Sequence, residues 1–182
     1  MKRSSIAATA AKSLLFIAAL FPFAGITTIA QAQGWDRPDA LTAELFPLNQ
    51  VPAVLAKSHG SFSAEINEDG TISFQLSYAD MSSPVTQAHI HFGASKTNGG
   101  VVVFLCGGQK PACPASGTVT GAITAADVSV LPATNGDSVI PQGIAPGDLA
   151  GLLTAIRAGD TYVNVHTETF PSGEIRGQVH VR

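Results

Sequence analysis

The stretch from Thr161 to Val181, TYVNVHTETFPSGEIRGQVHV, restricts the fold of this chain more than any other segment. Its apolar and polar residues alternate, and successive side chains of a β-strand leave on opposite faces. A turn at 170–173 separates two such runs. The pattern predicts a β-hairpin with one face that joins a core and one polar face. The apolar face carries Val163, Val165, Ile175, Gly177, Val179 and Val181, and the polar face carries Tyr162, Asn164, His166, Glu174, Arg176, Gln178 and His180.

A second segment, Ala88-His89-Ile90-His91-Phe92, carries two histidines on one face of a predicted strand. Their Cα atoms would lie ~6.6 Å apart at the usual strand rise. Neutral imidazoles at that spacing can bind a single ion at about 2.0–2.1 Å each. If this strand neighbours Thr161–Thr167, then His166 becomes a third ligand. The residues therefore suggest a copper or zinc site made of His89, His91 and His166.

Other polar residues would surround such a site. Asn164, Glu174 or Asp80 could orient the imidazoles through their second ring nitrogens. Arg176 shares the polar face, and we expect it to form an ion pair with Glu174 that contributes about 0–1 kcal/mol if exposed. The alternative is that the histidines are solvated, or are hydrogen-bonded to Asn164, Glu174 and Arg176 under a covering loop. His59 is expected at the surface.

The rest of the chain predicts an all-β fold with one helix. Leu149, Leu152, Leu153 and Ile156 recur with helical spacing, which predicts a helix over 148–158 capped by Asp148. A helical turn is expected at 125–128. Seven or eight short strands with one helix indicate an antiparallel β-sandwich of the immunoglobulin-like or superoxide-dismutase-like kind. The remaining strands are predicted at 41–48, 59–66, 71–78, 86–92, 101–105 and 116–124.

The first 32 residues have the form of a secretory signal peptide. Lys2, Arg3 and Lys12 form a basic start, an apolar run covers 14–24, and Ala30-Gln31-Ala32 fits a cleavage site. We expect cleavage after Ala32, a flexible tail at 33–40 and a secreted or periplasmic protein without stable membrane insertion. An uncleaved membrane anchor over 13–32 is the alternative.

Composition and cysteines bound the remaining possibilities. The signal segment holds three of the ten Lys and Arg and none of the thirteen Asp and Glu, which leaves a net charge of −6. That balance argues against nucleic acid as a partner. Cys106 and Cys113, in CGGQKPAC, are expected to form a disulfide in an exported protein. A two-thiolate metal site is the alternative for this pair.

The segments AHIHFG and NGGVVVFL, followed by LLTAIRAGDTYVNVHTETFPSGEIRGQV, resemble the CHRD domain, the module named after chordin. The resemblance runs from LTAELFPLNQVPAV to the C-terminus, which places the domain at 41–182. Gly100 stands where the family usually has proline, and LNQVPAV departs from the commoner form with glutamate before the proline. Bacterial members are similar: exported, single-domain, and often with a cysteine pair after the VVVFL-like strand. The resemblance implies an immunoglobulin-like sandwich and a protein partner.

Three hypotheses for function follow. We favour a non-catalytic, exported β-sandwich that binds or scaffolds. The alternative is a copper- or zinc-binding domain that uses His89, His91 and His166, and the third is a redox enzyme built on that metal. The H-x-H strand is similar to copper–zinc superoxide dismutase, but the further histidines and the bridging aspartate of that enzyme are missing downstream. No Ser or Cys nucleophile with a base in reach is evident, and we assign no catalytic residue.

Overall fold

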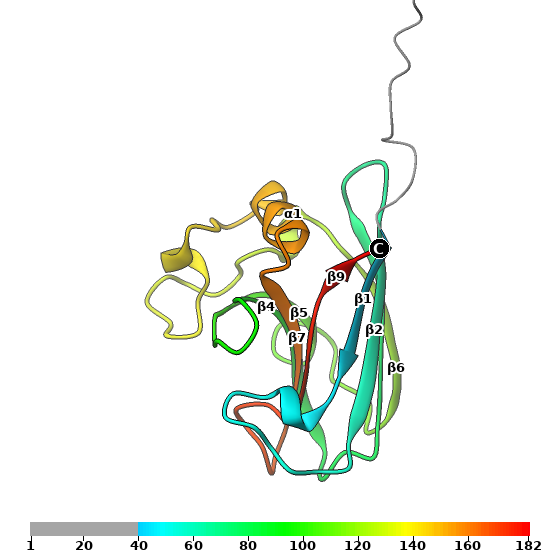
Figure 1. Ribbon diagram of the computed structural model, residues 1–182. Coiled ribbons are helices and arrows are strands. Elements are labelled where there is room, and N and C mark those ends of the chain that lie inside the picture. The colour runs from blue at the N-terminus through cyan, green and yellow to red at the C-terminus, as the bar shows by residue number, and fades with distance from the viewer. Residues whose placement is uncertain (1–39) are drawn as a thin grey trace, which may run out of the picture. The chain divides into compact units, whose positions relative to one another are not determined.

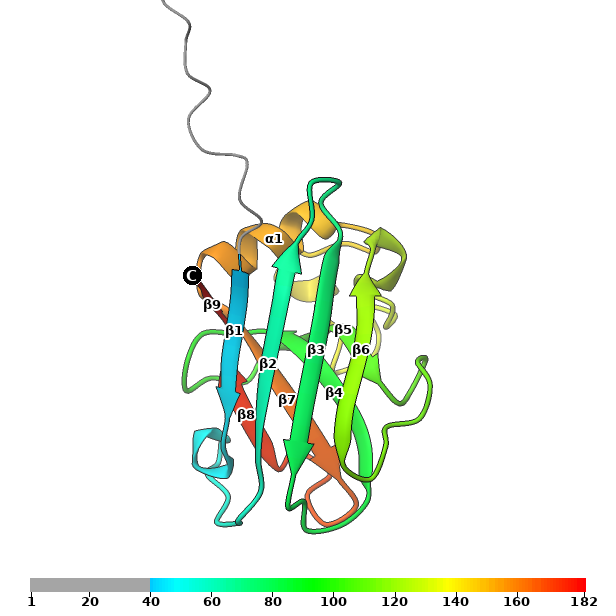
Figure 2. The same ribbon diagram turned by 90° about the vertical axis from the view of Figure 1, so that its right-hand side faces the viewer.

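Two antiparallel sheets form the part of the chain that the computed structural model describes, residues 40–182. Figure 1 shows the sheets nearly edge-on and facing each other, and Figure 2 shows the five-stranded sheet face-on. The five-stranded sheet has the order β6-β3-β2-β1-β9, and the four-stranded sheet has the order β5-β4-β7-β8. The predicted all-β sandwich is confirmed.

The strand bounds agree closely with the alternation in the sequence. The five-stranded sheet consists of β1 (Ala40–Leu45), β2 (His59–Ile66), β3 (Ile72–Ala79), β6 (Gly117–Ile123) and β9 (His180–Val181). The four-stranded sheet consists of β4 (Val85–Phe92), β5 (Gly100–Cys106), β7 (Thr161–Thr167) and β8 (Ile175–Gln178). The expected signal segment at 1–32 and tail at 33–40 lie outside the described residues, apart from Ala40, which begins β1.

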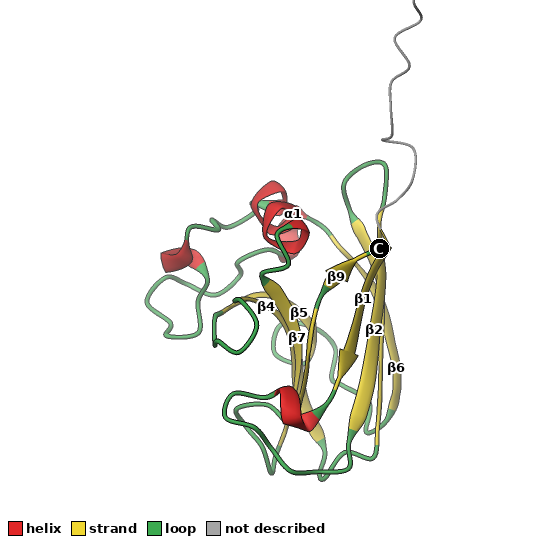
Figure 3. Ribbon diagram, viewed as in Figure 1, coloured by secondary structure: helices red, strands yellow, loops and turns green. Residues whose placement is uncertain are grey.

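Helical segments lie in the connections rather than between the sheets (Figure 3). The predicted helix is α1 (Leu149–Arg157), and the Asp148 carboxylate caps it by accepting a hydrogen bond from the Gly151 amide at 2.8 Å. The helical turn expected at 125–128 is a 3-10 turn at Ala125–Asp127. Two more such turns cover Pro47–Asn49 and Ile140–Gln142, so the first strand ends earlier than position 48. Among residues 40–182 no helix combines the length and apolarity that a membrane crossing requires.

The hydrophobic core fills the space between the two sheets. Each sheet contributes its apolar face, as the alternation predicts; fully buried examples are Leu45 and Leu76 on one side and Ile90, Val163 and Val165 on the other. The predicted disulfide Cys106–Cys113 is present at the end of β5. The opposite face of the four-stranded sheet does not pack against the five-stranded sheet, and it carries the polar side chains of β4 and β7.

The C-terminal segment differs from the expected simple hairpin. β8 pairs with β7, but the chain then changes sheets, and β9 pairs with β1. The change occurs at Val179, which is buried in the core while its amide donates to the Thr161 carbonyl. His180 is consequently exposed on the other sheet, and it lines one pocket together with Gln178 and Arg176.

Candidate metal centre

Three histidines meet on the outer face of the four-stranded sheet. β4 and β7 are neighbours, and their register pairs His89 with Asn164, His91 with Tyr162, and Gln87 with His166. One nitrogen from each of His89, His91 and His166 lies within 4.8 Å of one nitrogen of the other two. Strand parity thus predicted correctly that these residues share one sheet face.

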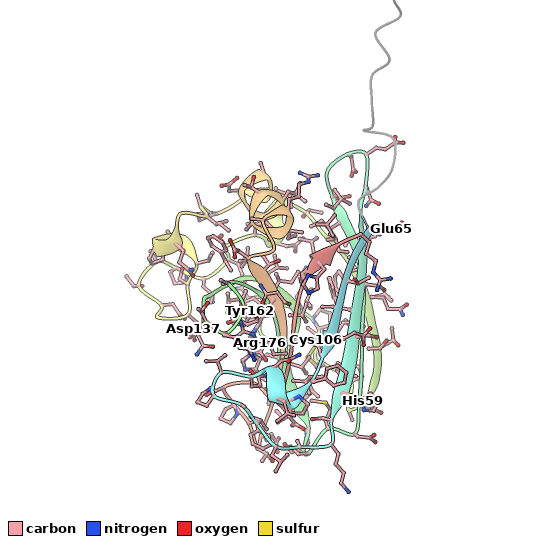
Figure 4. The ribbon with its side chains drawn as sticks, in the orientation of Figure 1. His59, Glu65, Cys106, Asp137, Tyr162 and Arg176 are labelled. Carbon is pink, nitrogen blue, oxygen red and sulfur yellow. A yellow bond between two sulfur atoms is a disulfide. The ribbon has the colours of Figure 1, made fainter. Side chains whose placement is uncertain are left out.

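The histidine face is not the open surface that a polar strand face would suggest. His89 and His91 are only 5% and 7% exposed, and His166 is half-buried. Loop residues that cover the sheet line a pocket of about 540 Å³ together with the imidazoles; they include Val51, Asn98, Leu131, Asp137 and Pro171. Figure 4 shows Asp137 at the side of this face, beyond Tyr162 and away from the five-stranded sheet.

Each imidazole has a hydrogen-bond acceptor at one ring nitrogen. His91 Nδ1 lies 3.0 Å from the Gly99 carbonyl, and His166 Nδ1 lies 2.9 Å from the Pro171 carbonyl. His89 Nε2 lies 3.0 Å from Gln87 Oε1. Because these oxygens only accept, each holds the ring proton on the nitrogen that faces it. We therefore assign the protons to His91 Nδ1, His166 Nδ1 and His89 Nε2.

The other nitrogen of each ring then carries a lone pair. His91 Nε2 is buried and has no hydrogen-bond partner among the described residues. His89 Nδ1 and His166 Nε2 lie 3.3 Å apart, with no proton between them in these tautomers. Two imidazole nitrogens bound to one ion at about 2.0–2.1 Å in a tetrahedral arrangement are about 3.3 Å apart. One ligand nitrogen from each ring lies within 4.8 Å of those of the other two, which is at most about 1.5 Å wider than that spacing.

Burial favours the neutral form of all three rings. Burial, with smaller contributions from the nearby His166 and His91, lowers the pKa of His89 to about 2. Burial likewise lowers the pKa of His91 to about 3, although its bond to Gly99 opposes the shift. The pKa of His166 is lowered by burial too, against the raising effect of Asp137. Neutral imidazoles are the form that binds metal ions.

A stack of three side chains supports His91. The Tyr162 ring lies parallel to the His91 ring with centroids 4.7 Å apart, and the Arg176 guanidinium carbon lies 3.4 Å from the Tyr162 centroid. Figure 4 shows Tyr162 and Arg176 side by side. Arg176 also donates to the Ala94 carbonyl and to Asn98 Oδ1, so the stack holds the loop whose Gly99 carbonyl orients His91.

Gly99 is required by close packing in that loop. A Cβ atom at this position would collide with the Phe92 backbone, and the Gly99 amide donates to the Tyr162 hydroxyl at 3.2 Å. Gly100 donates its amide hydrogen to Gln142 Oε1. Proline at this position would have no such hydrogen, so Gly100 helps to hold the loop at 140–142.

Two expectations about the polar residues were wrong. Glu174 does not pair with Arg176: its carboxylate accepts hydrogen bonds from Thr167 and Ser82 at the turn. Arg176 is 2% exposed and stacks on Tyr162 instead. Asp80 lies with His59 where the interior strands β2 and β3 of the other sheet meet, with 3.7 Å between their side chains, and His59 is exposed as expected. Asn164 accepts from Gln50 Nε2 at 2.6 Å and packs beside His89.

Several residues of the site were not found by sequence reasoning. Gln87 lies two positions before His89 and therefore on the same face, which was a usable signal. Tyr162 had been placed on the polar face but was given no role. The carbonyls of Gly99 and Pro171 leave no trace in the side-chain pattern, because every residue carries the same backbone acceptor.

Comparison with known proteins bears on the family. A family model described as the CHRD domain matches residues 41–179. No curated protein and no solved structure matches the chain. The matched range includes β2 to β8, nearly all of β1 and all three site histidines, and the chain therefore belongs to the CHRD domain family.

Proposed function

We propose that this chain is an exported CHRD domain that binds one copper or zinc ion through His89, His91 and His166. The observation that carries the proposal is the buried, unpartnered Nε2 of His91 beside two other imidazoles whose protons are held on their far nitrogens. A buried polar atom without a partner costs about 1–3 kcal/mol, and a metal ion would remove that cost.

This proposal reverses the order of the hypotheses drawn from sequence. A scaffold or binding module does not require three imidazole lone pairs to point toward one place, but a metal site does. Metal-bound histidines also usually donate their other ring N–H to a carbonyl or carboxylate, and each of these three rings has an oxygen acceptor at its other nitrogen. Export is supported by the signal-like start of the chain and by the disulfide, since disulfides persist in oxidising compartments. A protein partner stays a prediction.

Calorimetric titration tests the proposal on protein purified without a histidine tag and treated with chelator. We expect Zn²⁺ or Cu²⁺ to bind the wild-type protein with a stoichiometry of one. At a free metal concentration 100 times Kd, binding should add about 2.7 kcal/mol to the free energy of unfolding. The measurements are the heat of binding and the shift of the thermal transition.

Variants make the titration specific. His91→Ala should abolish stoichiometric binding, because it removes the ligand whose buried Nε2 has no hydrogen-bond partner among the described residues. His180→Ala is the matched control, since that imidazole is exposed on the other sheet. If His91→Ala keeps the stoichiometry and affinity of the wild-type protein, the metal is bound elsewhere or nonspecifically, and the proposal is wrong.

A further inference from the structure

We infer that the metal held by the three histidines keeps one coordination position open and accepts a small exogenous donor ligand from the adjoining pocket. This inference rests on the proposed function. The inference specifies the type of metal site: the metal exchanges a ligand and does not only stabilise the fold.

The number of protein donors is the first argument. Within residues 40–182 the cluster contains three histidines, and no fourth His, Cys, Asp or Glu donor joins them. Structural zinc sites are usually closed by four protein ligands, whereas sites with three protein ligands hold water or substrate in the fourth position. Gln87, the nearest neutral candidate, already uses its oxygen to accept from His89.

The pocket is the second argument. All three histidines line it, and its volume of about 540 Å³ leaves space for more than one water molecule. Its walls combine apolar side chains such as Phe104 and Leu131 with the polar groups of Asn135 and Ser172. His89 and His91 are enclosed and His166 is only half-buried, so the His166 side is where the pocket meets solvent.

The third observation is a negative charge in the pocket, which should affect the binding of anionic ligands. Asp137 lines the pocket from the loop beside the edge strand β5, where its carbonyl accepts from the Val101 amide; its side chain is exposed and acts electrostatically on His166. It is the acidic side chain among the residues that line the pocket. A ligand in this pocket lies in the electric field of this carboxylate, so Asp137 should weaken the binding of anions and leave neutral ligands less affected.

Azide binding to the Cu²⁺-loaded protein tests the inference. Azide bound directly to copper produces a ligand-to-metal charge-transfer band and changes the electron paramagnetic resonance spectrum. We expect a saturable change in both spectra with one azide per copper. Asp137→Asn should bind azide more tightly, because it removes a negative charge in the pocket. Asp80→Asn, which makes the same charge change after strand β3 of the other sheet, should leave azide binding unchanged.

The outcomes separate this inference from the proposal on which it rests. Failure of the wild-type protein to bind copper would overturn the proposed function itself. One copper per chain with spectra that do not respond to azide would leave the metal site standing and show that its coordination is closed, which overturns the inference. An equal effect of Asp137→Asn and Asp80→Asn would show that azide does not enter through this pocket.

Discussion

At the scale of single residues, the site depends on acceptors that lie behind the imidazoles. Pro171 contributes one of them, and it belongs to the turn that joins β7 to β8. The buried Glu174 carboxylate holds that turn in place by accepting from Ser82 and Thr167. Glu174 is thus structurally connected to His166 although the two side chains do not touch. The position of Glu174 in the sequence suggested an ion pair with Arg176, but in the structure its carboxylate stabilises the turn.

Replacing Glu174 should make stability depend on pH in a defined direction. Burial would raise the pKa of Glu174, but hydrogen bonds from Ser82 and Thr167 outweigh it and lower the pKa below its ordinary value of 4.5. The carboxylate therefore contributes stability that is present above pH 4.5 and is lost as the pH falls through the folded-state pKa. Glu174→Gln should lose about 1–3 kcal/mol at pH 7, and its difference from wild type should narrow below pH 4.5.

Urea unfolding at pH 7 and at acid pH measures this difference. Glu168→Gln is the matched control, because Glu168 lies in the same turn and is exposed. A gap between Glu174→Gln and wild type that stays constant as the pH falls would contradict the assigned role of the ionised carboxylate.

At the scale of elements, α1 contains a glycine, Gly151, whose low helix propensity is offset by its contact with the N-cap residue Asp148. Glycine inside a helix costs about 1 kcal/mol relative to alanine, so Gly151 looks like a defect. A Cβ atom at Gly151 would meet the carboxylate of Asp148, the residue that caps the helix by accepting from the Gly151 amide. The glycine therefore leaves space for the cap.

A double-mutant cycle tests this explanation. In the wild-type background, Gly151→Ala should gain about 1 kcal/mol of helix propensity and lose about 1 kcal/mol of capping, with little net change. In the Asp148→Ala background, the same substitution should stabilise the protein by about 1 kcal/mol, because no carboxylate opposes it. Equal effects of Gly151→Ala in the two backgrounds, measured by urea unfolding, would show that the cap and the glycine are independent.

Strand elements were the part of the fold that sequence could predict well. Period-two alternation gave the faces of β2, β3, β4 and β7 correctly, because a regular strand has no other way to place its side chains. It could not show that the chain leaves one sheet at Val179 and joins the other, because alternation carries no information about such a change. It failed for Glu174, which lies just before β8 begins at Ile175.

At the scale of the whole molecule, the two faces of the four-stranded sheet do different work. One face packs aliphatic side chains against the five-stranded sheet, and the other carries the histidines under covering loops. The three histidines come from β4 and β7, the two central strands of that sheet, which are also anchored through the core. A site built on such strands is held more rigidly than one built on loops.

What sequence could not predict is the covering of this face. The alternation indicated which side chains share a surface, but burial of His89 and His91 depends on loops that are distant in the chain, including the residues near Val51 and those at 131–137. Short-range patterns do not encode where such loops pack. The pKa values of the histidines and the selection of their tautomers follow from that packing, and so they too were beyond the sequence.

The most direct test of the central claim is a nitrogen-15 long-range correlation spectrum of the histidine rings, recorded at pH 7 before and after one equivalent of Zn²⁺. The account predicts neutral rings with the proton on Nδ1 of His91 and His166 and on Nε2 of His89. Zinc should then shift the opposite nitrogen of each ring, while His59 and His180 stay unchanged. A proton on His91 Nε2, or site histidines that do not respond to zinc, would contradict it.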